Sequence, residues 1–147
     1  MTTADPLPST VLAFDFGTRR IGVAVGNTLL RIAQPLTTIA DERSAERFAA
    51  IAALIDAWKP DHLVVGLPVH ADGTEHDMTA RARRFARQLE GRFALPVAQV
   101  DERWTSEAAD DLLAAQGRHG RAARAERDQV AAQIILQGWF DDQAAAR

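Results

Sequence analysis

The sequence predicts an α/β domain in which helices flank a mixed five-stranded sheet, and three patterns support this fold class. Residues 11–14 and 21–25 are short apolar runs separated by Gly and polar residues, which is the pattern of a β-hairpin. Both runs are almost continuously apolar, which indicates strands that are covered on both faces. Residues 62–66 and 97–100 are further apolar runs that each follow a helical pattern, as expected for parallel strands reached through helices.

The other elements follow from periodicity and from stop signals. Residues 35–39 form a short third strand, and Pro35 at its start suits the edge of a sheet. In the first helix, helical spacing predicts a buried stripe formed by Phe48, Ile51, Ala52, Ile55 and Trp58. The predicted helices cover residues 41–58, 77–93, 105–115 and 126–140, with an Arg- and Gly-rich loop at residues 117–124. This order predicts a three-strand antiparallel meander joined to two strands parallel to its first strand.

A single domain is expected at residues 11–141, after a flexible lead-in at residues 1–10 and before a tail at residues 142–147. A chain of this length buries roughly 70% of its unfolded surface, so its core needs no covalent or metal staple. The absence of cysteine excludes disulfides, thiolate metal sites and cysteine nucleophiles. No apolar stretch is as long as a membrane span, and no signal peptide is evident.

The net charge of −3 is not typical of a nucleic-acid-binding protein, but the arginines are concentrated in two segments. Those at residues 81–87 follow the outer face of a predicted helix, and a solvated face is the favoured interpretation. The second group lies just before Asp128 and can reach a phosphate backbone bound beside it. This group consists of Arg118, Arg121, Arg124 and Arg127. Without a ladder of aromatic side chains, recognition by shape or by junction is expected, not by base identity.

Four carboxylates stand where the predicted elements converge. Asp15 ends the first strand, and Asp101 and Glu102 end the last strand, so parallel strands would place them at one edge of the sheet. Asp128 precedes Ala131, by three residues, on the stripe of the final helix that faces the sheet. Taken singly, each has an ordinary interpretation: a turn cap for Asp15, a strand-end ion pair for the second pair, and a helix N-terminal acid for Asp128.

Taken together, these acids predict a metal site. Two carboxylates about 4 Å apart repel by roughly 4 kcal/mol at an effective dielectric of 20, so a cluster of them takes up protons or binds a cation. Oxygen ligands without cysteine suit Mg²⁺ or Mn²⁺ better than Zn²⁺. Such ions clamp the attacking and leaving oxygens of a phosphodiester, so the sequence predicts metal-assisted phosphodiester hydrolysis.

Four ordered stretches resemble the YqgF/RuvX family. They are DFGTRRIGVAVGN (residues 15–27), VVGLP with DGTE (64–68 and 72–75), LPVAQVDERWTS (95–106) and RDQVAAQIIL (127–136). The resemblance implies an RNase H-like fold related to RuvC Holliday-junction resolvases. It also implies a bacterial, cytoplasmic nuclease that matures the 5′ end of pre-16S rRNA, with junction resolution or a non-catalytic nucleic-acid-binding module as alternatives.

The resemblance also suggests roles for individual residues. It implies that Asp15, Glu102 and Asp128 are the catalytic and metal-binding set, holding Mg²⁺ or Mn²⁺. Asp101 is a possible further ligand, and Arg103 is a candidate phosphate contact. The expected loop beside the site contains Thr18, Arg20 and His70, and His70 and His76 are either proton relays or solvated loop residues. The expected partners are structured RNA or branched DNA, bound by a monomer or a weak homodimer.

Overall fold

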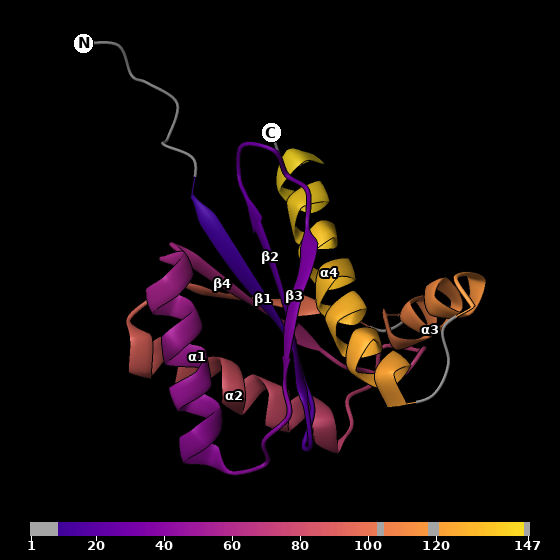
Figure 1. Cartoon of the computed structure of the whole chain (residues 1–147), viewed down its shortest axis with the longest axis horizontal. Helices are drawn as coiled ribbons and strands as arrows, with labels where there is room; N and C mark the ends of the chain where they lie inside the picture. Colours follow the sequence, from indigo (N-terminus) through magenta and orange to yellow (C-terminus); the bar gives the residue numbers. More distant parts are fainter. Residues whose placement is uncertain (1–8, 103–104, 118–120, 146–147) are drawn as a thin grey trace.

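Five strands form one sheet in this computed structural model, which describes residues 9–102, 105–117 and 121–145. The strands are β1 (Thr10–Phe16), β2 (Ile21–Asn27), β3 (Gln34–Ile39), β4 (His62–Leu67) and β5 (Val97–Asp101). Their order across the sheet is β3-β2-β1-β4-β5 (Figure 1). β2 pairs antiparallel with β1 and with β3, whereas β4 is parallel to β1 and β5 is parallel to β4. The predicted meander with two added parallel strands is confirmed, and β3 lies at the predicted edge.

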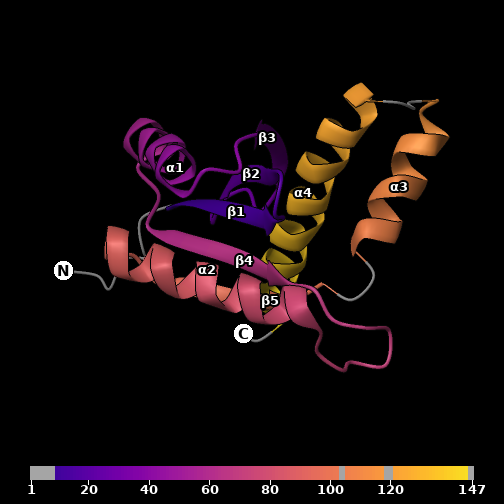
Figure 2. The same ribbon diagram turned by 90° about the horizontal axis from the view of Figure 1, so that it is seen from below.

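Helices cover both faces of the sheet. They are α1 (Ser44–Trp58), α2 (Asp77–Phe93), α3 (Thr105–Ala115) and α4 (Arg121–Ala145). α1 and α2 lie on one face, α4 crosses the other, and α3 packs against α4 on the side away from the sheet (Figure 2). None of the helices in the described ranges combines the length and apolar content needed to span a lipid bilayer.

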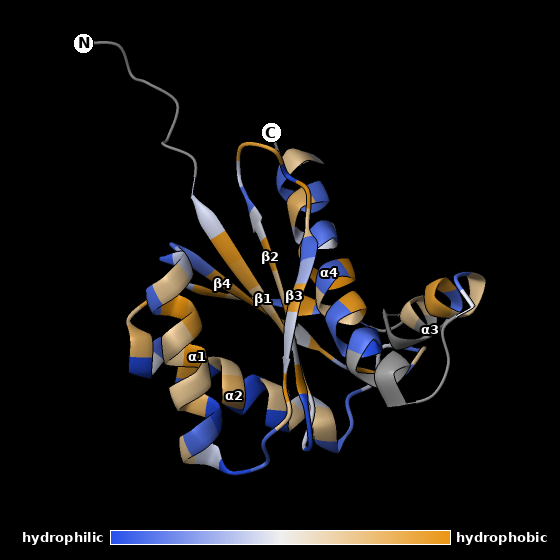
Figure 3. Ribbon diagram, in the orientation of Figure 1, coloured by the Kyte–Doolittle hydropathy of each residue, from blue (hydrophilic) through white to orange (hydrophobic). Residues whose placement is uncertain are grey.

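Alternation along β1 divides the core into two clusters. Leu12 and Phe14 point toward α1 and α2, whereas Val11 and Ala13 point toward α4, and all four are fully buried. Figure 3 shows the resulting apolar centre of the sheet, with mostly polar turns on the outer sides of the helices. The near-continuous apolar pattern of β1 and β2 therefore reflects burial on both faces, as predicted.

The buried stripe of α1 differs from its prediction. Phe48 and Ile51 are buried as expected, but Ala52 is exposed and Trp58 is 43% exposed. Trp58 is the last residue of α1, and Lys59 leaves the helix in a left-handed conformation, so the tryptophan extends past the edge of the core. Arg47 takes the remaining place on the buried stripe.

α4 is longer than predicted at both ends. It begins at Arg121 and not near residue 126, and it continues to Ala145 through residues expected to form a tail. The Ala-, Arg- and Gln-rich composition of these ends favours helix, which explains the extension. Asp128 therefore lies about two turns inside α4, and its interpretation as a helix N-terminal acid is wrong.

Candidate active site

The candidate site lies where the C-terminal ends of β1 and β5 meet α4. Asp15 continues the face of β1 that carries Val11 and Ala13, so its side chain lies on the α4 side of the sheet. Glu102 follows the last residue of β5, and its backbone N–H donates to Leu67 O at 3.1 Å. Asp15, Glu102 and Asp128 all line one pocket of about 340 Å³. The structure thus brings together three acids that lie far apart in the sequence.

Two glycines inside strands make room for this arrangement. Gly22 pairs with Asp15 across the hairpin, and a Cβ atom there would lie 1.9 Å from the backbone oxygen of Asp128. A Cβ atom at Gly66 would lie 2.7 Å from Glu102 Oε2 and 2.4 Å from the side chain of Ile135. All of these distances are far too short for a real carbon atom, so the absence of a side chain at the two glycines lets α4 and Glu102 approach the sheet.

Burial and mutual repulsion strongly perturb two of the carboxyl groups. Burial, reinforced by the charge of Asp128, raises the pKa of Asp15 from its ordinary 3.8 to about 7, against the opposing effects of a hydrogen bond with Glu102 and the charge of Arg127. Burial and then the charge of Asp15 raise the pKa of Glu102 from 4.5 to about 9.

The third carboxylate has a different partner. Arg20 Nε donates to Asp128 Oδ2 at 2.5 Å, and the two side chains are 33% and 11% exposed. Glu102 Oε2 is buried and receives no hydrogen bond from an N–H or hydroxyl group of the described residues. Within those residues, no three carboxylate or imidazole groups are already arranged to hold a metal ion. The three acids lie in one pocket, and the carboxylate of Asp128 is already paired with the guanidinium of Arg20.

The turn after Asp15 contributes the basic wall of the site. Thr18, Arg19 and Arg20 line the pocket, as does Arg127 one residue before Asp128. Arg47, from α1, holds this turn in place, because its Nη2 donates to Gly17 O at 2.6 Å and its Nε donates to Asp41 O. The positions of Thr18, Arg20 and Arg127 near the acids agree with the sequence prediction.

Other predicted site residues lie elsewhere. Asp101 is exposed at the end of β5 and does not line the pocket, although its charge contributes to the raised pKa of Glu102. His70 is exposed in the loop before α2 and also lies outside the pocket lining. Arg103 and Arg118 lie outside the described residues, and Arg121 and Arg124 are described only as backbone in α4. The structure therefore leaves their predicted phosphate contacts untested.

His76 is the histidine that reaches the pocket. It caps α2, where its Nδ1 accepts the backbone N–H of Met78 at 3.2 Å, and its ring lies 4.8 Å from that of His70. Gly22 and Gly66 are further residues that sequence reasoning did not single out. Their signal was a glycine inside an otherwise apolar strand, which marks a close approach by another part of the chain.

The raised pKa values predict that the metal-free protein loses stability as pH rises. The pKa of Asp15 rises on folding from 3.8 to about 7, and that of Glu102 from 4.5 to about 9. Between each pair of values the folded state holds a proton that the unfolded state has released, so each step up in pH favours the unfolded state. We expect the free energy of unfolding in EDTA to fall by at least about 2 kcal/mol between about pH 5 and pH 8.

Urea denaturation at several pH values measures this effect. Asp15→Asn should flatten the pH dependence, whereas Asp56→Asn, at an exposed site on α1, should leave it unchanged. A free energy of unfolding that rises with pH over this range would contradict the assignment of buried, repelling acids.

Comparison with known proteins agrees with this fold and this motif order. The family model described as RuvX, Holliday junction resolvase, matches residues 9–142. A relative from Chromobacterium violaceum is 57% identical over 92% of this chain and 99% of its own length. A relative from Nitrosomonas europaea is 57% identical over 99% of this chain and 97% of its own length. Both are named as candidate pre-16S rRNA nucleases.

Solved structures of resolvases share the architecture. Thermus thermophilus RuvC in complex with a Holliday junction aligns with a TM-score of 0.57 and 14% identity, covering 92% of this chain and 96% of that chain. Fowlpox virus resolvase, also bound to a Holliday junction, aligns with a TM-score of 0.57 and 10% identity, covering 91% and 98%. At this identity the likeness concerns the fold, which is the predicted RNase H-like fold. With the family match over residues 9–142, the chain belongs to the RuvX family.

Proposed function

We propose that this protein is a divalent-metal-dependent nuclease that hydrolyses phosphodiester bonds in the 5′-end maturation of pre-16S rRNA in the cytoplasm. The observation that carries the proposal is the convergence of Asp15, Glu102 and Asp128, from three separate elements, on one pocket with a basic wall. The names of the relatives from Chromobacterium violaceum and Nitrosomonas europaea support the RNA substrate.

The residues of the pocket fit Mg²⁺ or Mn²⁺. All three acids offer oxygen atoms, and Glu102 Oε2 is buried with no hydrogen-bond partner among the described residues, which is a costly arrangement that a cation would relieve. A bound divalent ion would supply Lewis-acid stabilisation of the charge that develops on the phosphoryl oxygens.

The basic residues of the pocket would orient the substrate. Arg19, Arg20 and Arg127 line the same pocket as the acids, so their guanidinium groups can bind the phosphates beside the bond that is cleaved. These contacts address the backbone and carry no base information. Arg103, Arg118, Arg121 and Arg124 are proposed to extend this phosphate contact along the bound strand.

Arg20 is expected to compete with the metal ion for Asp128. Arg20→Gln removes the ion pair and one positive charge from the pocket, so we expect the Kd for Mn²⁺, measured by calorimetry, to fall. An ion pair worth up to about 1 kcal/mol corresponds to a change of about two- to fivefold. Arg19→Gln is the matched control, since it removes one charge from the same pocket and should change the Kd less. Weaker Mn²⁺ binding by Arg20→Gln would show instead that Arg20 orients Asp128 for the ion.

A substrate comparison tests the proposed activity. Purified protein is incubated with labelled precursor 16S rRNA and with a four-way DNA junction, each with Mg²⁺ or Mn²⁺. Cleavage of the RNA at its 5′ side supports the proposal. Cleavage of the junction alone would instead favour a Holliday junction resolvase, the second candidate, which the description of the matching family supports. A resolvase must cut two strands and so requires two active sites, which a dimer measured by sedimentation would supply. No metal-dependent cleavage of either substrate would leave a non-catalytic binding module.

A further inference from the structure

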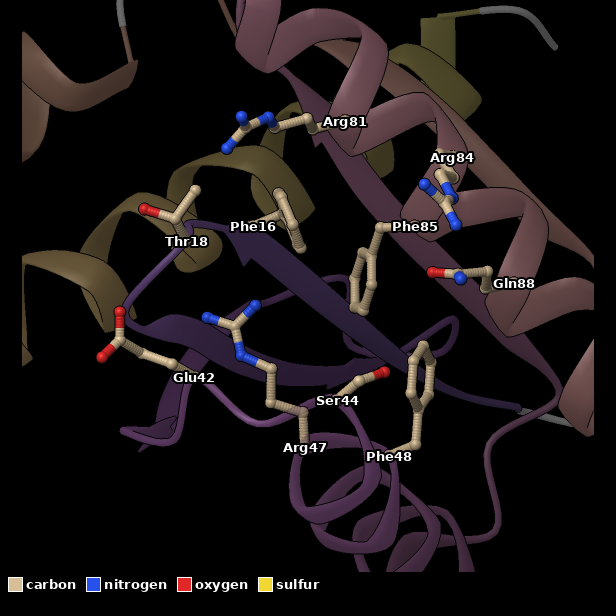
Figure 4. Close-up of a pocket in the computed structure, with 10 residues that line it drawn as sticks. All are labelled: Phe16, Thr18, Glu42, Ser44, Arg47, Phe48, Arg81, Arg84, Phe85 and Gln88. Carbon is tan, nitrogen blue, oxygen red and sulfur yellow. The ribbon is translucent and has the colours of Figure 1, made fainter.

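A second pocket lies on the opposite face of the sheet, at the same end as Asp15. It has a volume of about 440 Å³, within the range of ligand sites, and is formed by the end of β1, the first turns of α1 and the side of α2 (Figure 4). No part of the hydrolytic mechanism uses this pocket. Its place in the fold and its lining both point to a ligand.

The two pockets share lining residues at the tip of β1. Side chains alternate along the strand, so Asp15 lies on the α4 side and Phe16 lies on the side of α1 and α2. Phe16 and Thr18 line both pockets. A strand of nucleic acid bound at the carboxylates can therefore turn past Thr18 and enter the second pocket without leaving the protein surface.

One wall of this second pocket is aromatic. The rings of Phe16 and Phe85 lie 4.8 Å apart with a tilt of 31°, and the ring of Phe48 lies 6.0 Å from that of Phe85. The guanidinium of Arg47 lies 5.5 Å from the centre of the Phe16 ring, and Arg47 is 7% exposed. Phe48 and Phe85 are buried, so the half-buried ring of Phe16, held in place by these neighbours, is the aromatic surface on which an unpaired base can stack.

The rim of the second pocket is positively charged. Arg81 and Arg84 stand one turn apart on α2, both are exposed, and both line the pocket, against a single acid, Glu42. In Figure 4, Arg81 extends from α2 toward Thr18, a residue that lines both pockets. An apolar ligand would make no favourable contact with these cations, and a free inorganic anion would make none with the aromatic wall. A nucleotide can contact both, with its base on the aromatic wall and its phosphate at the arginines.

We propose that this pocket holds one unpaired nucleotide of the bound strand, with its base against the aromatic wall and its phosphate at Arg81 and Arg84. The inference rests on the proposed nuclease function and specifies its substrate: a strand that is single-stranded beside the cleaved bond. Because every base has a flat face, such a pocket reads the absence of pairing and not the sequence. Arg81 and Arg84 then belong to the binding surface, in contrast to the solvated face that the sequence favoured.

Fluorescence anisotropy in EDTA, where no cleavage occurs, tests this pocket. The probes are a blunt RNA duplex and the same duplex with a short single-stranded overhang. We expect the overhang to tighten binding by the wild type by about tenfold, from stacking of one base and neutralisation of its phosphate. Arg81→Gln with Arg84→Gln should lose most of this gain. The matched control is Arg83→Gln with Arg87→Gln, which removes two charges from the same helix outside the pocket and should keep it.

A charge-neutral variant separates the pocket from general electrostatics. Ser44→Leu places a larger aliphatic side chain, which has no flat face for a base, in the pocket, so it should also remove the gain from the overhang while leaving blunt-duplex binding unchanged. The proposal is overturned if the wild type shows no gain, if both double variants lose it equally, or if it survives Ser44→Leu. Cleavage of precursor RNA without an overhang effect would overturn only this pocket, and an overhang effect without any cleavage would overturn only the nuclease.

Discussion

Asp15→Asn lowers metal-dependent cleavage by at least about 10³-fold while binding of the same RNA is retained. This result is expected because the change removes one of the charges of the acid cluster without changing the size of the side chain. Metal ions supply several kcal/mol of transition-state stabilisation, and each 1.36 kcal/mol corresponds to a factor of ten in rate. Single-turnover cleavage of labelled precursor 16S rRNA measures the first effect, and anisotropy measures the second.

Asp101→Asn is the matched control for this experiment. Asp101 is an acid of the same strand end, one residue before Glu102, but it is exposed and does not line the pocket. Its variant should therefore cleave at a rate close to that of the wild type. An active Asp15→Asn protein, or an Asp101→Asn protein as inactive as Asp15→Asn, would contradict the assignment of the acid cluster.

Gly22→Ala destabilises the protein by at least about 3 kcal/mol and separates α4 from the sheet. The added Cβ would stand 1.9 Å from Asp128 O and 2.9 Å from Asp128 Cβ, and these are backbone and near-backbone atoms that no rotamer change can move. Overpacking of a buried contact typically costs 1–3 kcal/mol and sometimes more. Because the displaced segment carries Asp128, we expect the variant to lose Mn²⁺ binding as well as stability.

Gly138→Ala tests the same substitution in α4 at an open position. A Cβ atom at Gly138 would meet nothing within 4 Å, so alanine there should stabilise the helix by about 0.5–1 kcal/mol. Urea denaturation of the two variants compares them directly. Equal stability of Gly22→Ala and the wild type would show that α4 does not approach the sheet as closely as described.

Local patterns in the sequence determined most of the architecture. The apolar runs of β1 and β2, the edge proline of β3 and the helix–strand alternation were enough to predict the sheet, because each pattern reflects burial over a few neighbouring residues. The same patterns failed at Trp58 and at the start of α4. The exposure of Trp58 depends on where the helix ends relative to the sheet, which no local window contains, whereas the start of α4 was interpreted as a loop although its Ala and Arg residues also favour helix.

The sequence placed Asp15, Glu102 and Asp128 together, because strand ends and helix stripes position side chains by simple periodicity, but it also included Asp101, which lies outside the pocket. The order of the family motifs carried the same information. The sequence did not predict how closely these residues approach one another. The contact of Asp128 with Gly22, which pairs with Asp15, and the position of Glu102 beside Gly66 depend on the packing of α4 against the sheet. Their only trace in the sequence was a glycine in each apolar strand.

What the sequence by itself determined was the element order, the edge of the sheet where the acids gather and the family to which the chain belongs. The tertiary structure alone decided that Arg20 binds Asp128, that burial raises the pKa of Asp15 and of Glu102, and that a second pocket opens beside Phe16. The physical reason is range. Periodicity and propensity act between neighbours in the chain, whereas ion pairs, desolvation and pocket shape arise between residues that meet only after folding.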